Sequence, residues 1–175
     1  AVAKLKQDDP NLQVVLAKAS SLKDPYFYKV FNNALSKQSN LTQGDVRIIE
    51  HDNHAVLSAC DAVVMASGTV TLEAAIYHTP MVITYKGPWL PYQIVRRVCY
   101  LPCLGLPNIL CHMDDNFELP LTFPEYYQYD VTGKQLYETI KPLLNQESPE
   151  HNKQKKAFKK IQQKLQASND ASRPA

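Results

Sequence analysis

A serine, a glycine and a threonine stand where an apolar run ends and a helical pattern begins. Ser67, Gly68 and Thr69 follow the apolar run 62–66, and Glu73 lies one turn into the pattern. The first turn of a helix has unpaired backbone N–H groups and a partial positive charge, so it attracts phosphate. Glycine lets a ligand approach the backbone, and the two hydroxyls can cap the helix or donate to phosphate oxygens. A carboxylate one turn further in suits a ribose diol.

The same residues also have a plainer interpretation. Most Ser/Thr-rich helix starts are simple caps, and a helical glutamate is often a surface charge. The pattern S-G-T-x-x-x-E alone therefore leaves a ligand site and an ordinary cap both open.

The elements around this junction alternate between strand and helix. Apolar runs predict strands at 12–17, 46–49, 62–66 and 81–85, and helical spacing predicts helices at 24–37, 54–60, 69–78 and 91–100. This alternation is typical of an α/β fold with a doubly wound parallel sheet, whose ligands bind outside the carboxyl ends of the strands.

The helix predicted at 24–37 has its own start signal. Tyr28, Phe31 and Leu35 recur at helical spacing, which predicts the apolar face. Asp24 followed by Pro25 predicts an N-cap with proline in the first turn.

The alternation breaks down after about residue 105. Segment 101–110 is predicted to be a turn-rich ordered loop, 118–130 is aromatic and proline-rich, helices are predicted at 132–145 and 150–165, and the tail 167–175 is expected to fray. We therefore expect an α/β domain over 1–146 and a basic helix with its tail over 147–175. The chain opens with the end of a helix, so a first strand is expected before residue 1, and the sequence is interpreted as a fragment of a longer polypeptide.

The last predicted helix is rich in lysine. Its cations are Lys153, Lys155, Lys156, Lys159, Lys160 and Lys164, around a thin apolar stripe of Phe158, Ile161 and Leu165. Either the stripe packs on its own domain, or the helix is a basic amphipathic surface that meets anionic lipid or a partner subunit. Charge alone does not separate the two.

Composition excludes several functional classes. A net charge of +2, with no recognisable nucleic-acid-binding motif, argues against a nucleic-acid partner. The four cysteines, Cys60, Cys99, Cys103 and Cys111, have no CxxC spacing and are expected to be free thiols. His51 and His54 are interpreted as surface residues. No metal site is predicted.

The segment "SACDAVVMASGTVTLEAAIYHTPMVITYK" resembles the nucleotide-binding half of the lipid-A-disaccharide synthases, inverting glycosyltransferases of the two-Rossmann-domain (GT-B) type. The family pattern is an Asp-Ala strand, S-G-T-x-x-L-E, and a Pro-Met-Val-(Val/Ile)-x-Tyr strand with a basic residue. It is matched here by Asp61, Ala62, Ser67, Gly68, Thr69, Leu72, Glu73, Pro80, Met81, Val82, Ile83, Tyr85 and Lys86. "GLPNIL" (105–110), with Gly105 in place of Ser, and "PEYYQ" (124–128) match two further family elements in the same order.

Two features depart from the family pattern. "CHMDDNFELP" (111–120) replaces basic residues that usually follow the Pro-Asn segment, which removes an expected phosphate contact. The family's Pro-Gly-Ser-Arg loop and its acceptor-binding domain would precede residue 1.

The resemblance implies a reaction and a set of roles. The family transfers 2,3-diacylglucosamine from its UDP conjugate to 2,3-diacylglucosamine 1-phosphate, which forms the lipid A disaccharide and releases UDP, without metal or cofactor. Diphosphate is expected at Ser67, Gly68 and Thr69, ribose at Glu73, and the donor pocket at Tyr85, Lys86, Asn108, Glu125 and Gln128. The general base is expected outside this chain, so the 175-residue chain alone is predicted to be inactive.

Both implied substrates carry acyl chains. The resemblance therefore implies a cytoplasmic enzyme, peripheral to the inner membrane of a Gram-negative bacterium and possibly a homo-oligomer. Segment 87–106 mixes Trp89 and Ile94 with Arg96 and Arg97. It is either an interfacial segment or a helix packed on the sheet.

Two other functions stay open. One is another UDP-N-acetylglucosamine enzyme of the same architecture, such as the peptidoglycan N-acetylglucosaminyltransferase or a 2-epimerase, which shares the Ser-Gly and acidic-helix arrangement but not the "GLPNIL" match. The other is a non-catalytic nucleotide-binding or oligomerisation module. Products formed from acylated and non-acylated acceptors would distinguish the enzymes.

Overall fold

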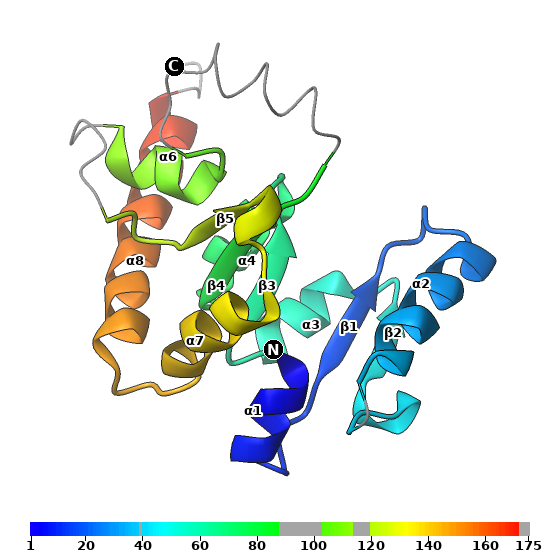
Figure 1. The fold of residues 1–175 in the computed structure, drawn as a ribbon. Helices are drawn as coiled ribbons and strands as arrows, with labels where there is room; N and C mark the ends of the chain where they lie inside the picture. The colour runs from blue at the N-terminus through cyan, green and yellow to red at the C-terminus, as the bar shows by residue number, and fades with distance from the viewer. Residues whose placement is uncertain (39, 88–102, 114–119, 172–175) are drawn as a thin grey trace. The chain divides into compact units, whose positions relative to one another are not determined.

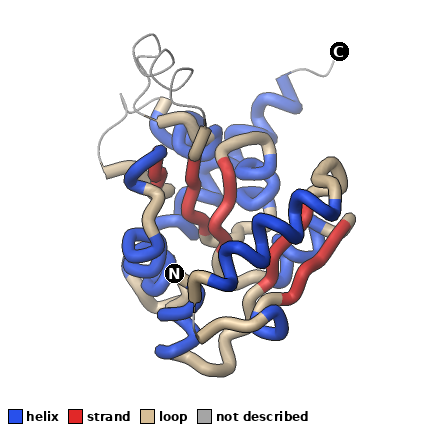
Figure 2. Tube along the Cα trace, turned by 45° about the vertical axis from the view of Figure 1, so that its right-hand side comes forward, coloured by secondary structure: helices blue, strands red, loops and turns tan. Residues whose placement is uncertain are grey.

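The computed structural model describes residues 1–38, 40–87, 103–113 and 120–171, the last four by their backbone alone (Figure 1). The chain divides into two compact units, Ala1–Ala59 and Cys60–Ala175. Each unit combines helices with parallel strands (Figure 2), so the α/β class is confirmed. The helix predicted at 91–100, with Cys99 and the aromatic and basic residues proposed to face a membrane, lies outside the described residues.

The first unit is built around two strands. Its elements are α1 (Val2–Asp8), β1 (Val15–Lys18), α2 (Asp24–Ser36), the 3-10 turn η1 (Gln43–Asp45), β2 (Arg47–Glu50) and α3 (Asn53–Ala59). β1 and β2 are parallel, with Val15 opposite Arg47 and Lys18 opposite Glu50. Both predicted strands and both predicted helices are present here with small shifts of their ends.

The start of α2 differs from the prediction. Lys23 is the N-cap and Asp24 is already helical, with no side-chain cap. The Asp24 carboxylate instead accepts a hydrogen bond from the ammonium group of Lys18, which is only 3% exposed and also donates to Glu50 at 2.9 Å. A buried ammonium group needs carboxylate partners, and this need outweighs the capping preference of Asp24.

The apolar face of α2 includes the predicted Phe31 and Leu35, both half-buried, but its third residue is Phe27 and not Tyr28. Phe27 is the buried residue, and its ring stacks on Phe31 with centroids 6.0 Å apart. Tyr28 is 41% exposed. The buried ring of Phe27 also lies beside the ammonium group of Lys18, which is 5.6 Å from the ring centroid.

The second unit contains three parallel strands in the order β3 (Val63–Ala66), β4 (Met81–Tyr85) and β5 (Glu125–Tyr127). Val63 pairs with Met81 and Ile83 pairs with Glu125. The central strand β4 has the predicted bounds, and its residues Met81, Val82 and Ile83 are fully buried, as expected for a strand covered on both faces. β5 lies in the aromatic and proline-rich segment 118–130, where no strand was predicted from the sequence.

Four described helices surround this sheet: α4 (Val70–Ile76), α6 (Leu106–His112), α7 (Gly133–Leu143) and α8 (Pro149–Ala171). α8 contacts α4, α6 and α7 (Figure 1). Phe158 of α8 is buried against Phe123 and His78, with ring centroids 5.3 Å and 5.7 Å away. The stripe of the lysine-rich helix therefore packs on its own unit.

The helix predicted at 150–165 is longer in the structure, where α8 covers Pro149–Ala171. α8 continues to Ala171, so fraying from residue 167 was a wrong prediction for 167–171. The boundary predicted between residues 146 and 147 stays a prediction, while α8, which follows it, packs within the second unit.

The loop predicted at 101–110 was wrong from Leu106 onward, where α6 begins. Pro107 sits in its first turn, where no backbone N–H is needed. At the other end, Lys160 donates to the carbonyl oxygen of Cys111 at 2.9 Å, and Lys164 donates to that of Leu110 at 2.7 Å. A distant helix thus satisfies the last carbonyl groups of α6, which local sequence cannot reveal.

Candidate functional site

The residues predicted to bind a ligand follow the carboxyl ends of the three strands. β3 ends at Ala66, β4 at Tyr85 and β5 at Tyr127, and because all three are parallel their ends form one edge of the sheet. Ser67–Thr69, Lys86 and Gln128 come directly after these ends. The structure therefore brings three segments of the predicted site to the same edge, where ligands of open α/β sheets bind.

Ser67 is fixed by the sheet and by a neighbouring segment. Its backbone N–H donates to the carbonyl oxygen of Thr84 at 3.0 Å, which extends the pairing of β3 with β4. Its hydroxyl donates to the carbonyl oxygen of Leu104 at 3.2 Å. Ser67 thus joins the strand end to the segment before α6.

The start of α4 is open to solvent. Gly68 and Thr69 are exposed, and apart from the adjoining residues no atom of the described chain lies within 4 Å of the position that a Cβ on Gly68 would occupy. Thr69 is the N-cap, and its side chain makes no capping hydrogen bond. Thr71, which is fully buried, donates to the carbonyl oxygen of Gly68 at 2.6 Å and holds this turn in place. Gly68 does not have a positive φ, so backbone conformation does not require a glycine here.

Glu73 lies on α4 and is half-buried. Within the part of the chain that the structure describes, its carboxylate has no hydrogen-bond or ion-pair partner. The carboxylate is therefore available to accept hydrogen bonds from a ligand.

Gln128 links the ends of β4 and β5. Its backbone has φ 51°, a left-handed conformation, and its side-chain amide donates to the carbonyl oxygen of Gly87 at 3.0 Å. A Cβ on Gly87 would lie 2.9 Å from the Tyr85 hydroxyl, so a larger residue here would make the Tyr85 side chain shift. Lys86, between them, is exposed.

Glu125 is the centre of a hydrogen-bond network at the start of α6. One carboxylate oxygen accepts from the Leu104 N–H at 2.9 Å and from the hydroxyl of Tyr127. The other accepts from the Gly105 N–H at 3.0 Å and from the side-chain amide of Asn108 at 2.7 Å. The carboxylate thus binds backbone N–H groups at the positive end of α6, which is the favourable place for an anion.

Asn108 is fully buried in the same network. Its amide also donates to the carbonyl oxygen of Phe123 at 2.7 Å, and its own oxygen accepts from the Phe123 N–H at 2.9 Å. The candidates Asn108 and Glu125 therefore bond to each other and to the backbone, and Leu104 connects this network to Ser67.

Sequence analysis missed two members of the network, Leu104 and Tyr127. Tyr127 donates to Glu125, and its oxygen accepts from the Leu104 N–H at 3.1 Å. Burial, followed by the bond to Glu125, raises the pKa of Tyr127 far above its ordinary value. A signal was present, because residues two apart on a strand point to the same face.

Gly105 has no side chain, which leaves room for the Glu125 carboxylate in the hydrogen-bond network. A Cβ at this position would lie 2.5 Å from a carboxylate oxygen of Glu125 and 2.6 Å from the Cδ1 atom of Ile83. Beside it, burial and the charge of Glu125 raise the pKa of the Cys103 thiol to about 12. The thiol stays protonated, as suits a buried side chain.

Among the residues with described positions, no group of three or more His, Cys, Asp or Glu side chains is placed to hold a metal ion. Within the same residues, none of the helices has the length and apolar character needed to cross a bilayer. Among the described residues, Cys60, Cys103 and Cys111 form no disulfide.

Parallel strands alternating with helices, and an exposed helix start at the carboxyl end of β3, define a Rossmann-like α/β protein. The family model for lipid-A-disaccharide synthetase matches residues 1–174, and the chain belongs to this family.

Individual relatives agree with this assignment. The chain is 40% identical over 149 residues to a lipid-A-disaccharide synthase of Cupriavidus pinatubonensis, covering 83% of this chain and 33% of that protein. It is 32% identical over 173 residues to one of Pseudomonas putida, covering 98% and 41% respectively. A third, from Albidiferax ferrireducens, is 43% identical over 98 residues, covering 56% and 23%. The chain thus spans well under half the length of these relatives.

Proposed function

We propose that this chain supplies the donor-binding part of a lipid-A-disaccharide synthase. The reaction transfers 2,3-diacylglucosamine from its UDP conjugate to 2,3-diacylglucosamine 1-phosphate, and forms lipid A disaccharide 1-phosphate and UDP. The observation that carries the proposal is the family match over residues 1–174, combined with the solvent-open start of α4 at the carboxyl edge of the sheet.

In the proposed site, Ser67, Gly68 and Thr69 receive the diphosphate of the donor. Exposed backbone N–H groups at the start of a helix suit the negative charge that grows on UDP as it leaves. Glu73, whose carboxylate has no partner among the described residues, accepts from the ribose hydroxyls. Support for this arrangement comes from the exposure of Gly68 and Thr69.

The remaining candidates shape the donor pocket. Tyr85, Lys86 and Gln128 line it from the ends of β4 and β5, and the exposed ammonium group of Lys86 adds positive charge. Asn108 and Glu125 act on the pocket by holding segment 103–105 against Ser67, because their polar atoms already bond within the protein. No residue of this chain is proposed as the general base.

The acylated substrates place the proposed enzyme at a membrane surface. We propose a cytoplasmic location, peripheral to the inner membrane, because the fatty acyl chains of both substrates stay in the bilayer while the sugars react. Flotation with liposomes, comparing the protein with its Trp89→Ser and Ile94→Ser variants, tests whether segment 87–106 makes the contact. Undiminished flotation would exclude that segment.

Nucleotide binding is tested by titrating the protein with UDP before and after Glu73→Ala. Loss of hydrogen bonds to a charged group is expected to weaken binding by about tenfold or more. Glu147→Ala is the matched control, because Glu147 is exposed and lies between α7 and α8. An unchanged dissociation constant for Glu73→Ala would remove Glu73 from the site.

The acceptor is tested by product analysis on a full-length enzyme that contains this donor-binding part, because the 175-residue chain alone is predicted to be inactive. Disaccharide formed from acylated but not from non-acylated glucosamine acceptors is expected of the proposed enzyme. Transfer to a non-acylated acceptor, or epimerisation of the donor without transfer, would favour the other UDP-sugar enzymes.

A further inference from the structure

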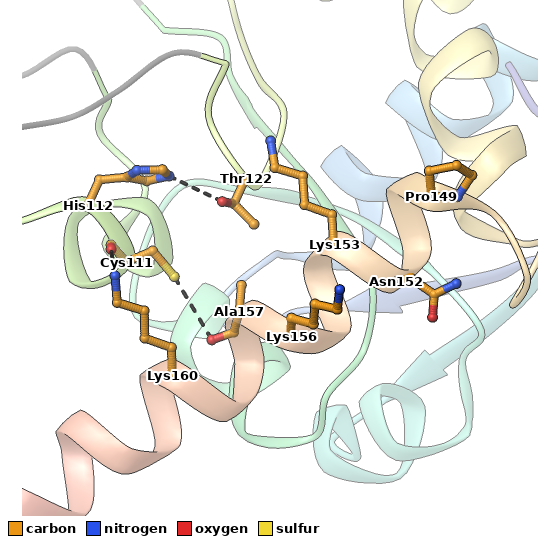
Figure 3. Close-up of a pocket in the computed structure, with 9 residues that line it drawn as sticks. All are labelled: Cys111, His112, Thr122, Pro149, Asn152, Lys153, Lys156, Ala157 and Lys160. Atoms are coloured by element: carbon orange, nitrogen blue, oxygen red, sulfur yellow. Dashed lines mark hydrogen bonds between the residues drawn. The ribbon is translucent and has the colours of Figure 1, made fainter. Parts of the chain in front are cut away.

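A pocket of about 490 Å³ lies between α6, α8 and the segment after residue 120 (Figure 3). Its walls are Cys111 and His112 from α6, Thr122, and Pro149, Asn152, Lys153, Lys156, Ala157 and Lys160 from α8. None of these residues belongs to the proposed nucleotide site. The pocket is therefore a feature that the proposed function leaves unexplained.

The pocket is lined by three ammonium groups from one helix. Lys153, Lys156 and Lys160 recur at helical spacing and line the same wall. Like charges three and four residues apart on a helix repel each other and reduce its stability. Within the described chain, no carboxylate forms a salt bridge with Lys153 or Lys156.

The three lysines that line the pocket differ in the hydrogen bonds that they make within the protein. Lys160 donates to the Cys111 carbonyl oxygen at 2.9 Å, which stabilises the negative end of α6. Lys153 donates to the carbonyl oxygens of Pro120 and Leu121 at 3.1 Å and 3.3 Å, which are neutral acceptors, and it has no carboxylate partner among the described residues. Lys156 has no hydrogen-bond partner within the described chain.

Other hydrogen-bonding side chains accompany the lysines. His112 and Thr122 are joined by a hydrogen bond of 3.2 Å on the wall facing α8, and Asn152 lies on α8 itself (Figure 3). Ammonium groups with hydroxyl, amide and imidazole groups are the usual partners of phosphate oxygens.

We propose that this pocket binds a phosphate-type oxyanion, with Lys153 and Lys156 as its principal contacts. The same chemistry is presented by a soluble phosphate compound and by the phosphodiester headgroup of an anionic lipid. An anion seated among the lysines would remove their mutual repulsion, which neither the packing of α8 nor the capping of α6 does.

Two probes distinguish the possible sources on the full chain. In the first arm, inorganic phosphate is titrated into the protein by calorimetry at low salt. In the second arm, the protein is sedimented with phosphatidylcholine vesicles that contain or lack phosphatidylglycerol. Binding of phosphate alone identifies a soluble ligand, whereas retention on the phosphatidylglycerol vesicles identifies a lipid headgroup.

The decisive variant is Lys153→Gln with Lys156→Gln. Its matched control is Lys155→Gln with Lys159→Gln, which removes the same charge from exposed positions of α8 outside the pocket. The pocket variant is expected to weaken binding about tenfold or more, because charge-assisted bonds are lost, and the control less than about twofold. Lys153→Arg with Lys156→Arg keeps the charge and should keep binding.

Three results would overturn the proposal: no binding in either arm, equal weakening by the two glutamine pairs, or loss of binding in the arginine pair while the glutamine pair retains it. UDP affinity, measured in parallel, should be the same for the pocket variant and the parent. The outcome for this pocket is therefore independent of the outcome for the nucleotide site.

Discussion

Glu125 connects its own strand, β5, to the start of α6 and, through Leu104, to Ser67. Its carboxylate accepts from Leu104, Gly105, Asn108 and Tyr127, and Leu104 in turn accepts from the hydroxyl of Ser67. The residue therefore fixes the start of α6 and, through it, one side of the candidate nucleotide site. Its effect on a ligand would be indirect.

Glu125→Gln is expected to lower the free energy of unfolding by about 1–3 kcal/mol, because an amide cannot accept from all four donors and loses the charge. Chemical denaturation measures the change, with Glu147→Gln as the control for a surface carboxylate. UDP affinity should fall with it if segment 103–105 positions Ser67. A variant as stable as the parent would contradict the network.

A second prediction at the scale of single residues is that the stability contributed by Asp45 depends on pH. Hydrogen bonds from the backbone and side chain of Thr42, both at 2.8 Å, and the ammonium group of Lys6 at 3.1 Å lower the pKa of Asp45 to about 2. Because the folded state favours the carboxylate, the stability that Asp45 contributes is present above its unfolded pKa of about 3.9 and is lost as the pH falls towards 2.

An NMR titration of the Asp45 carboxyl carbon measures this directly. Its midpoint is expected near pH 2, and Asp45→Asn should reduce the loss of stability between about pH 4 and pH 2. A midpoint close to 4 would show that the hydrogen bonds from Thr42 to Asp45 do not form in solution.

At the scale of elements, α8 is joined to β4 by a buried glutamine. The side chain of Gln154, 1% exposed, accepts from the Met81 N–H at 2.8 Å and donates to the Met81 carbonyl oxygen at 3.0 Å. These bonds satisfy both backbone groups at the first residue of the central strand.

Gln154→Met keeps the length of the side chain but leaves both Met81 groups without a partner in an apolar interior. The free energy of unfolding is expected to fall by about 2–4 kcal/mol, from the desolvation of two unsatisfied groups. Denaturant unfolding checks this against Gln163→Met, at an exposed position of the same helix. Equal effects of the two substitutions would show that Gln154 contributes only its helix propensity.

The sequence predicted correctly the elements that are determined by their own residues. The uninterrupted apolar run 81–85 predicted β4 at its observed bounds, because a strand buried on both faces needs no polar alternation. α6 was missed because "GLPNIL" has turn-forming residues, while its two ends are satisfied by Glu125 and by the lysines of α8. Those partners are remote in sequence and adjacent only after folding.

Some residues of the candidate site could likewise be placed from local sequence, and others could not. Parallel strands predicted that Ser67, Tyr85 and Lys86 meet at one edge, and the structure places them there. The inward direction of Asn108 and Glu125 depends on β5 and α6, neither of which was predicted. Their interpretation as direct donor contacts stays a prediction, and the bonds they make favour the positioning role proposed above.

At the scale of the whole molecule, the chain has two compact units, and the unit that binds a ligand is the one in which hydrogen exchange is expected to slow. The candidate nucleotide site lies in the second unit, Cys60–Ala175. A ligand that binds only the folded state stabilises it by about 2.7 kcal/mol at a hundred times its dissociation constant. Slower hydrogen exchange should then appear first in the elements that contact it.

Hydrogen exchange with and without UDP is therefore expected to show protection of the amides of 67–73, since they begin the helix that would hold the diphosphate. Protection should extend to 104–108 through the bond between Ser67 and Leu104, and should weaken in Glu73→Ala. The first turn of α7, 133–136, serves as an internal reference because its Thr132 cap already satisfies it. Protection confined to 1–59, with 67–73 unchanged, would assign nucleotide binding to the first unit and leave the open start of α4 without that role.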